Sequence, residues 1–502
     1  MSLATVYSRA SFGLLAPQVV VETHLSNGLP QFTIVGLPET AVKESKDRVR
    51  SALLQNGYEF PKRRITVNLA PADLPKEGGR FDLPIAISIL LASEQLHCED
   101  ISQFELAGEL SLGGELRPIK GILPLALATQ KIKRQLIIPI ANQEEAAWVS
   151  PLIIYAMPNF KSVCTHLSGA TSYLPLRTPE NNFHQNDEAC LSEVCGQQHA
   201  KRALEIAASG AHSLLMTGPP GTGKTMLASR LSSILPPLTH KEALEIAAIY
   251  SISQQGFDAR TLKKRPFRRP HHTASAVSLV GGGRYPLPGE VSLAHLGVLF
   301  LDELPEFSRH VLEVLREPLE SGCIHLSRAQ GQAEYPAKCQ LIAAMNPCPC
   351  GYLSSTTQAC RCSPEQVQRY RNKISGPLLD RIDMHIEVPS LAASQLADFD
   401  PQLEESSVKV QERVLQARVQ QHKRSPHPNA KLTTREIVDF CKLDKPAEQL
   451  LTKAMEKLGI SARAYHRILK VARTIADLDN SESIQSPHIA EAIQFRKYDR
   501  QV

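Results

Sequence analysis

Short segments of alternating apolar and polar residues, interspersed with segments of helical period, make up the first 175 residues. The β-type segments are "QVVVETHL" (18–25), "QFTIVGL" (31–37), "RRITVNLA" (63–70) and "RQLIIPI" (134–140). The helical segments are "AVKESKDRVRSALLQNG" (41–57) and "LPIAISILLASEQ" (83–95). This mixture predicts an α/β domain over residues 1–175.

The rest of the chain divides by the same criterion. The polar stretch "RTPENNFHQNDEAC" (177–190) has almost nothing to bury, which predicts a linker over residues 176–190. Strands and helices alternate again over 191–395, as in an α/β core. Over 396–502 the apolar residues follow helical spacing around a polar loop, "HKRSPHPNAKLTT" (422–434), which predicts a helical bundle.

The segment "HSLLMTGPPGTGKTMLASRL" (212–231) places a glycine-rich loop between an apolar strand and a helix. In such a loop the backbone N–H groups surround a triphosphate, Lys224 reaches the β- and γ-phosphates and the Thr225 hydroxyl binds Mg²⁺. The sequence therefore predicts a site for ATP and Mg²⁺. Its expected residues are Gly218, Pro219, Pro220, Gly221, Thr222, Gly223, Lys224 and Thr225.

Two further buried strands end in polar residues that suit this site. "GVLFLDE" (297–303) ends in Asp302, which can bind Mg²⁺, and Glu303, which can activate the attacking water. "CQLIAAMN" (339–346) ends in Asn346, which can sense the γ-phosphate. Because the ligands of open α/β sheets bind at the carboxyl ends of the strands, we expect these side chains to converge.

Two arginines are candidates for the same chemistry. Arg381 lies in a turn before a strand, where it can neutralise charge on the γ-phosphate of a neighbouring chain. Arg463 begins a helix in the C-terminal region, from which it can reach the nucleotide. A surface ion pair is the alternative for either residue.

Composition adds little about partners. The net charge is only +5, and the basic clusters Lys62–Arg64 and "KKRPFRR" (263–269) are also typical of a solvated surface. The chain shows neither a signal-peptide pattern nor an apolar run long enough to span a bilayer, so we expect a cytoplasmic protein with reduced thiols and no membrane partner.

Four cysteines lie within fifteen residues of each other: Cys348, Cys350, Cys360 and Cys362. Residues i and i+2 of an extended segment face the same side, so each Cys-x-Cys pair can direct two thiolates at one ion. Four thiolates suit a structural Zn²⁺. An iron–sulfur cluster and unliganded thiols are the alternatives.

Long motifs in this chain resemble those of one family. They are the glycine-rich loop, "PFRRPHHTASAVSLVGGGRYPLPGEVSLAHLGVLFLDE" (266–303), "AAMNPCPCG" (343–351), "SGPLLDRID" (375–383), "SARAYHRILKVARTIADL" (461–478) and "GLPETAVKESKDRVRSAL" (36–53). They are similar to the ComM/YifB group of magnesium-chelatase-like AAA+ ATPases. The resemblance implies a central AAA+ domain with a C-terminal helical lid, in a homo-hexameric ring that binds ATP between subunits.

The same resemblance implies roles and partners. Arg381 would act in trans, and Arg463 would be a sensor arginine of the lid. The ring would be a helicase that migrates branches while incoming single-stranded DNA is integrated in natural transformation. Its partners would be single-stranded and branched DNA and a recombinase filament.

Two N-terminal stretches, residues 73–90 and 106–128, are similar to the proteolytic domain of Lon, which has a ribosomal S5-like fold. Alignment on their Lys-acid-Gly and Pro-Ile-x-Gly landmarks places Arg80 at the nucleophilic serine and Leu123 at the activating lysine. A guanidinium is no nucleophile at neutral pH, and leucine cannot accept a proton. We therefore expect a catalytically dead Lon-like domain that serves ring assembly or DNA contact, with Lys62, Arg63 and Arg64 as candidate contacts.

The segment "GCIHLSRAQGQAEYPAKCQLIA" (322–343) predicts two strands around a polar turn. Related ring helicases project a hairpin into the central pore from this place, which makes Arg328 near the tip and Lys338 on the returning run candidates for phosphate contact. A solvent-exposed hairpin without a ligand is the alternative.

Two other functions share the AAA+ core. A chelatase motor subunit would drive insertion of Mg²⁺ into a porphyrin, but the chain lacks the acidic integrin-like domain of chelatase partners. An ATP-dependent protease or unfoldase is disfavoured by Arg80 and Leu123.

Overall fold

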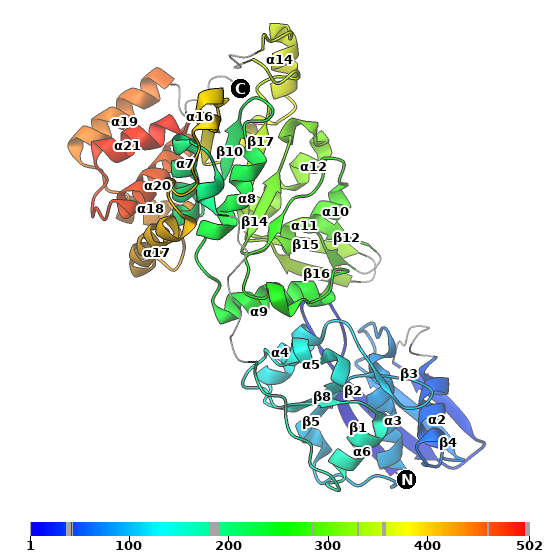
Figure 1. Cartoon of the computed structure of the whole chain (residues 1–502). Helices are drawn as coiled ribbons and strands as arrows, with labels where there is room; N and C mark the ends of the chain where they lie inside the picture. Colours follow the sequence, from blue (N-terminus) through cyan, green and yellow to red (C-terminus); the bar gives the residue numbers. More distant parts are fainter. Residues whose placement is uncertain are drawn as a thin grey trace.

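The structure is a computed structural model that describes residues 2–36, 42, 44–179, 190–283, 286–328, 331–353, 358–458 and 461–496. Figure 1 shows an N-terminal part (blue to cyan) below a central part (green to yellow), with a helical C-terminal part (orange to red) on the flank of the central part. Most of the linker predicted over 176–190 lies outside the described residues. Among the described helices, none combines the length and apolarity that crossing a membrane requires.

A seven-stranded mixed sheet forms the N-terminal part. The pairs β1–β2 and β2–β4 are antiparallel, and the other pairs are parallel. In β2 and β4 buried residues alternate with half-buried or exposed ones, so one face of these strands lies on the core. In sheet order the strands are β3 (Gln31–Val35), β4 (Arg64–Ala70), β2 (Gln18–Ser26), β1 (Ser2–Arg9), β5 (Phe104–Leu106), β8 (Gln135–Pro139) and β9 (Ile154–Met157).

The predicted mixed α/β character of this part is confirmed, but the sequence did not indicate the central strand β1. The last two residues of this strand, Ser8 and Arg9, are polar although both are buried. Arg9 Nε donates to Glu105 Oε2 of β5 over 2.6 Å, so an ion pair takes the place of apolar contacts. The helices of this part are α2 (Ser45–Gln55), α3 (Asp82–Ala92), α4 (Ile122–Lys131), α5 (Gln143–Ala146) and α6 (Phe160–Leu167), and a small ladder joins β6 (Glu109–Leu110) to β7 (Leu116–Arg117).

The central part contains a sheet of five parallel strands. In sheet order they are β11 (Phe267–Arg268), β14 (Val298–Leu301), β17 (Gln340–Met345), β10 (Leu214–Thr217) and β18 (Met384–Glu387). Every residue of β14 and β17 is buried, as the apolar runs predict for strands covered on both faces. Because all five strands run the same way, their carboxyl ends meet at one edge of the sheet.

Helices cover this sheet and extend it. They are α7 (Gln198–Gly210), α8 (Lys224–Ile234), α9 (His240–Ile252), α10 (Ala276–Val280), α11 (Glu290–Leu293), α12 (Arg309–Val314), α13 (Arg316–Ser321), α14 (Pro364–Arg371), α15 (Gly376–Leu379) and α16 (Ala393–Ala397). Two antiparallel pairs lie outside the five-stranded sheet: β12 (Gly281–Gly282) with β13 (Leu287–Pro288), and β15 (Cys323–Arg328) with β16 (Gly331–Pro336).

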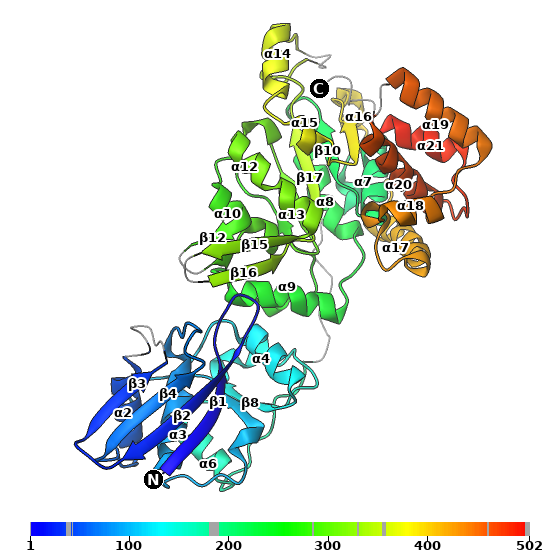
Figure 2. The same ribbon diagram turned by 180° about the vertical axis from the view of Figure 1, so that it is seen from behind.

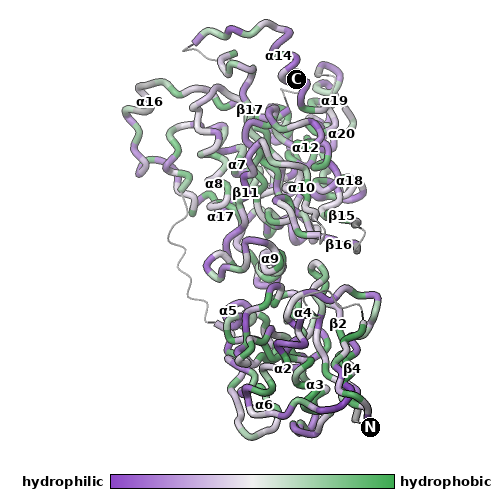
Figure 3. Tube along the Cα trace, turned by 90° about the vertical axis from the view of Figure 1, so that its right-hand side faces the viewer, coloured by the Kyte–Doolittle hydropathy of each residue, from purple (hydrophilic) through white to green (hydrophobic). Residues whose placement is uncertain are grey.

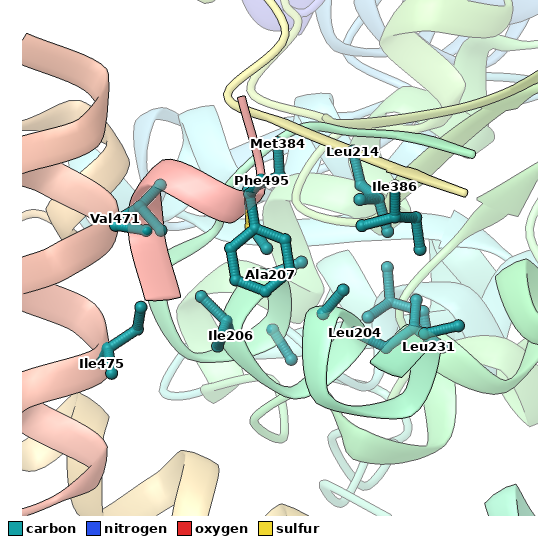
Figure 4. Close-up of a cluster of buried hydrophobic side chains, with 14 of the residues drawn as sticks. Leu204, Ile206, Ala207, Leu214, Leu231, Met384, Ile386, Val471, Ile475 and Phe495 are labelled. Carbon is teal, nitrogen blue, oxygen red and sulfur yellow. The ribbon is translucent and has the colours of Figure 1, made fainter. Parts of the chain in front are cut away.

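The C-terminal part is helical, with α17 (Ser407–Arg424), α18 (Thr434–Phe440), α19 (Lys445–Leu458), α20 (Ala462–Leu478) and α21 (Ser486–Gln494). It shares one hydrophobic core with the five-stranded sheet. In Figure 4, Val471 and Ile475 of α20 face the same cluster as Ile206 and Ala207 of α7. The C-terminal helices are therefore packed onto the central part through α7.

The polar loop predicted at 422–434 is shorter and more ordered than its composition indicated. Its first three residues complete α17. Asn429 is buried and donates to Asp477 Oδ2 of α20 over 2.8 Å, and Arg424 Nη2 donates to the same carboxylate over 2.6 Å. The charged and polar residues of this segment therefore have partners inside the bundle, which a reading of polarity alone misses.

The N-terminal and central parts meet at α9, which lies at the junction in Figure 3. Ala243, Ala247 and Ala248 of α9 share a hydrophobic cluster with Leu123 of α4, which is fully buried. Figure 2 shows the turn between β1 and β2 also reaching the central part beside β16. There Gly13 lies so close to Tyr335 that a Cβ at this position would be 3.3 Å from the phenol oxygen.

A carboxylate of α5 faces this junction. Burial raises the pKa of Glu145 to about 7, although the Ser251 hydroxyl of α9 and the Leu123 amide partly oppose the rise. One of its oxygens, Oε1, has no hydrogen-bond partner within the described structure. The junction therefore favours the protonated form of this side chain.

Replacement of Glu145 by glutamine is expected to stabilise the protein at pH 8.5 by at least about 1 kcal/mol, because the parent pays for burying a charge that glutamine lacks. Since the pKa is raised on folding, the destabilisation begins above the unfolded pKa and is complete above about pH 7. The gain should thus shrink in thermal melting at pH 5.5. Glu144→Gln, on the same helix but exposed, is the control; an equal gain at both pH values would contradict the assignment.

Candidate functional site

The predicted phosphate loop connects β10 to α8, and α8 begins at Lys224. Gly221 and Gly223 adopt φ values of +77° and +82°, which glycine tolerates without strain. At Gly218 a Cβ would be 2.2 Å from the Val388 carbonyl oxygen, so only glycine fits. The loop borders an open cleft of about 390 Å³, lined by Pro220, Gly221, Thr222, Gly223, Lys224, Thr225, Asp302, Glu303, Met345 and Asn346.

Lys224 is held at the bottom of the cleft. Its Nζ donates to the carbonyls of Gly218 (2.8 Å) and Pro219 (2.7 Å) and lies 3.3 Å from Asn346 Oδ1. Burial lowers the pKa of the Lys224 ammonium, and the charges of Asp302 and Glu303 oppose this shift. The predicted convergence of the strand ends of β10, β14 and β17 is therefore present in the geometry.

The acidic pair follows β14. Asp302 Oδ2 accepts from Thr225 Oγ1 over 2.9 Å, so hydroxyl and carboxylate lie side by side. Glu303 has φ +53°, which turns the chain sharply after the strand. A hydroxyl of the phosphate loop and a carboxylate after a neighbouring strand are the protein oxygens that suit Mg²⁺, with phosphate oxygens and water as its other ligands. The cleft therefore fits a nucleotide triphosphate with Mg²⁺, whose charge would neutralise the phosphate oxygens.

Two residues that the sequence analysis gave no role also reach the acidic pair. Arg269 Nη2 donates to Asp302 Oδ2 over 2.7 Å, and His272 Nδ1 lies 3.3 Å from Glu303 Oε2. Both come from the segment after β11, which pairs with β14 and so places them at the same edge. Arg269 ends the basic cluster 263–269, so the charge was visible in the sequence but its target was not.

Arg381 lies at the other edge of the sheet. It comes before β18, whose first residue pairs with the first residue of β10, whereas the phosphate loop follows the last residue of β10. The Ser213 hydroxyl at the amino end of β10 donates to the Arg381 carbonyl over 3.1 Å. The guanidinium pairs with Glu320 of α13 and donates to the Pro377 carbonyl over 2.6 Å. The structure does not bring Arg381 to the phosphate loop of its own chain.

Arg463 is exposed in the first turn of α20. One turn later, Arg467 Nη1 donates to the Arg381 carbonyl over 2.9 Å and pairs with the buried Asp383 carboxylate. The sequence placed Arg463 within reach of the nucleotide from the lid. Its helix begins near Arg381, at the edge remote from the phosphate loop of the same chain, and contact of Arg463 with a nucleotide stays a prediction.

The four predicted cysteines do come together. The Sγ atoms of Cys348, Cys350 and Cys360 are 3.4 to 3.7 Å apart, and all four Sγ atoms, including that of Cys362, lie within 4.8 Å of one another. Sulfurs 2.3 Å from a tetrahedral Zn²⁺ are separated by about 3.8 Å, so the cluster fits this ion. Gly351, with φ +85°, makes the turn after the first pair.

The predicted hairpin is present as β15 and β16, with Arg328 paired to Gly331 at the end of the described strands. Residues 329–330 lie outside the described residues. Lys338 is exposed but does not lie on the returning strand. It follows β16 by two residues and packs at the foot of the hairpin, where a Cβ on Gly322 would be 3.2 Å from its side chain. The two basic residues are therefore at opposite ends of the hairpin.

The two positions compared with peptidase residues have structural partners. The Arg80 side chain is buried and its Nη2 donates to the Lys120 carbonyl over 2.8 Å, and burial lowers its pKa to about 10. Leu123 packs against α9. Neither side chain can supply a nucleophile or a general base.

The five-stranded parallel sheet, the phosphate loop and the polar strand ends together define a P-loop ATPase of the AAA+ class. Three family models match: "Magnesium chelatase, subunit ChlI" over residues 190–396, "Subunit ChlI of Mg-chelatase" over 21–142 and "Magnesium chelatase, subunit ChlI C-terminal" over 404–496.

The chain is 54% identical to competence protein ComM of Haemophilus influenzae, over 99% of this chain and 98% of that protein. It is 49% identical to YifB of Escherichia coli, over 100% of this chain and 98% of that protein. The chain therefore belongs to the ComM/YifB family of magnesium-chelatase-like AAA+ ATPases, as the sequence motifs predicted.

Two partial matches extend the comparison. The DNA replication licensing factor Mcm2 of Drosophila melanogaster is 25% identical over 60% of this chain and 34% of that protein. The archaeal Lon protease of Archaeoglobus fulgidus is 40% identical over 63 residues, which are 12% of this chain and 10% of that protein.

Purified protein dialysed without added metal is expected to retain about one zinc per chain, held by the four cysteines. A Cys348→Ser/Cys350→Ser double variant should lose this zinc, because two thiolates cannot close a tetrahedral site. Elemental analysis checks both, with Cys164→Ser, a buried cysteine of α6, as control. Stoichiometric iron with visible absorbance would contradict the zinc assignment.

Proposed function

We propose that the chain is an ATP-driven DNA motor that promotes branch migration while incoming single-stranded DNA is integrated in natural transformation and homologous recombination. The observation that carries the DNA role is the whole-length similarity to a competence protein. The match to a DNA replication licensing factor supports it. Single-stranded and branched DNA would be the substrates, a recombinase filament a partner, and the cytoplasm the place of action.

ATP hydrolysis would take place in the cleft at the carboxyl ends of β10, β14 and β17. Lys224 would bind the β- and γ-phosphates, and Thr225 and Asp302 would hold Mg²⁺, which neutralises phosphate charge when bound. Glu303 would orient and deprotonate the attacking water, and Asn346 would contact the γ-phosphate. Departure of His272 from Glu303 would free that carboxylate for the water.

Arg381 and Arg463 support a ring. Each belongs to the edge of the sheet remote from the phosphate loop of the same chain. In a homo-hexamer, that edge of one subunit would face the cleft of the next, so both arginines would act on a neighbour's nucleotide. A guanidinium placed there stabilises charge that develops on the transferred phosphate.

The other parts would support this motor. The N-terminal domain would have the Lon-like fold without peptidase residues and would support ring assembly through its contact with α9. Its residues Lys62, Arg63 and Arg64 are exposed and would be available to contact DNA. Structural Zn²⁺ at the four cysteines would fix the segment between Asn346 and Arg381. The domains would extend over 1–175, 191–395 and 396–502.

A chelatase-type motor subunit without DNA activity is the second candidate, because the matching family models carry the name of such a subunit. One assay separates the two: the ATPase rate with single-stranded DNA, branched DNA, unfolded protein or no addition. Stimulation by branched DNA supports the DNA motor. An ATPase indifferent to every DNA would favour the chelatase-type function.

Lys224→Ala is expected to abolish nucleotide binding, because the phosphate loop then lacks the ammonium group that its Gly218 and Pro219 carbonyls hold in place for the phosphates. Glu303→Gln should bind ATP but hydrolyse it at least about 100-fold more slowly, since the amide cannot accept a proton. Equilibrium binding of a labelled ATP analogue and steady-state turnover measure the two effects. Parental turnover by Glu303→Gln would show that another group activates the water.

Arg381→Ala is expected to slow hydrolysis by about 10³-fold while ATP binding persists, because the lost charge acts in the transition state. Mixing this variant with Lys224→Ala should restore part of the activity, since some interfaces then combine an intact cleft with an intact arginine. Arg260→Ala, an exposed arginine paired with Asp258, is the control. Absence of rescue at every mixing ratio would argue against action in trans.

Arg328→Ala is expected to remove the stimulation of ATPase by DNA and to reduce the salt dependence of DNA binding by about one phosphate contact. Lys338→Ala should have the smaller effect, because Lys338 lies at the foot of the hairpin. Gln332→Ala, exposed and uncharged on the same hairpin, is the control. If Arg328→Ala migrates a Holliday junction at the parental rate, residues other than those of this hairpin must contact the DNA.

A further inference from the structure

The hairpin of β15 and β16 has two chemically different faces. Ile324 and Leu326 of β15 and Ala333 and Tyr335 of β16 are buried in the hydrophobic core beside the five-stranded sheet. Because successive side chains of a strand point to opposite faces, Cys323, His325 and Glu334 share the other face. His325 and Glu334 are exposed there, and Cys323 is half-buried.

The pairing register brings these three side chains together. His325 lies directly opposite Glu334 in the ladder, and Cys323 precedes His325 by two residues on the same strand. Cys323 Sγ is 3.3 Å from His325 Nε2, and one donor atom from each of the three residues lies within 4.8 Å of the others. A slip by one residue would bury the polar face and expose the apolar one, so the core fixes this arrangement.

We propose that Cys323, His325 and Glu334 form a second metal site, which takes a divalent transition-metal ion of the zinc class. A thiolate, an imidazole and a carboxylate are the three ligand types that Zn²⁺ accepts, at about 2.0 to 2.3 Å from the ion. The 3.3 Å between Cys323 Sγ and His325 Nε2 is close to the spacing of two donors on one tetrahedral ion, and a carboxylate oxygen of Glu334 lies within 4.8 Å of both. Mg²⁺ does not suit the site, because it requires six oxygen ligands in octahedral order.

This site differs in kind from the four-cysteine cluster. It offers three protein ligands, so the fourth position is open to water or to an exogenous donor, and the ion exchanges more readily than one enclosed by four thiolates. Binding deprotonates the Cys323 thiol, and the proton passes to solvent. The ion cross-links β15 to β16 at the foot of the hairpin.

The position of the site gives the ion a second effect. The Ser321 hydroxyl donates to the Cys323 carbonyl and accepts from the Cys323 N–H, which ties the first ligand to the end of α13. Glu320 on the same turn pairs with Arg381. Metal binding therefore stiffens the connection between the hairpin and the helix that holds the Arg381 guanidinium.

Titration of the full chain with Zn²⁺ against a chromophoric chelator tests the proposal. The parent should bind two Zn²⁺ per chain, one tightly at the four cysteines and one more weakly. Cys323→Ser, His325→Ala and Glu334→Gln should each weaken the second Zn²⁺ by at least about tenfold and leave the first unchanged. The controls are Cys98→Ser, a half-buried cysteine far away in the sequence, and Glu317→Gln, an exposed carboxylate of α13.

A second readout does not depend on affinity. Zn²⁺ should protect Cys323 from alkylation in the parent but not in His325→Ala, as peptide mass spectrometry measures. Co²⁺ added to parent that holds one zinc per chain, at the four cysteines, should give a thiolate-to-cobalt absorption band that Cys323→Ser lacks. Binding of a single Zn²⁺ by the parent, or parental binding of two by Cys323→Ser, would overturn the proposal. So would equal alkylation of Cys323 with and without Zn²⁺.

Discussion

The buried carboxylate of Asp383 joins the parts of the molecule that carry its chemistry. Burial by itself would raise its pKa, but Arg467, His212 and the Ser213 amide lower the pKa well below the ordinary range. The Ser213 amide is at the amino end of β10, and Arg467 belongs to the C-terminal helix α20. Removing either partner of such a buried pair typically costs about 3–5 kcal/mol, because the remaining charge stays desolvated. The C-terminal helix α20, the amino end of β10 and the segment of Arg381 are thus held together at one carboxylate.

Much of the site could be predicted because its residues follow from local rules. A strand of four apolar residues followed by polar ones predicts both burial and the edge at which the polar side chains lie, which is how Asp302, Glu303 and Asn346 were placed beside Lys224. The cysteine pairs were likewise predictable from the i, i+2 rule. The alternating apolar residues of β15 and β16 also predicted the hairpin that these strands form.

Contacts between distant segments could not be predicted from one sequence. The basic residue Arg269 had no identified target until β11 was seen to pair with β14. Nothing in the local pattern indicates that α20 lies beside Arg381, because that depends on how α20 packs on the sheet. Strand β1 was missed because its buried end is polar and is stabilised by an ion pair with Glu105, 96 residues away. In each case a long-range partner decides what the local pattern leaves open.

The close approach of Gly13 to Tyr335 makes the N-terminal part a mechanical neighbour of the hairpin. Tyr335 is anchored from the other side as well, since its hydroxyl donates to the Pro286 carbonyl over 2.6 Å. At φ +56°, Gly13 leaves no room for a side chain between the two parts without strain. The β1–β2 turn therefore leaves the foot of the hairpin no room on the side of the N-terminal sheet, and a displacement of Tyr335 in that direction would have to carry the N-terminal part along.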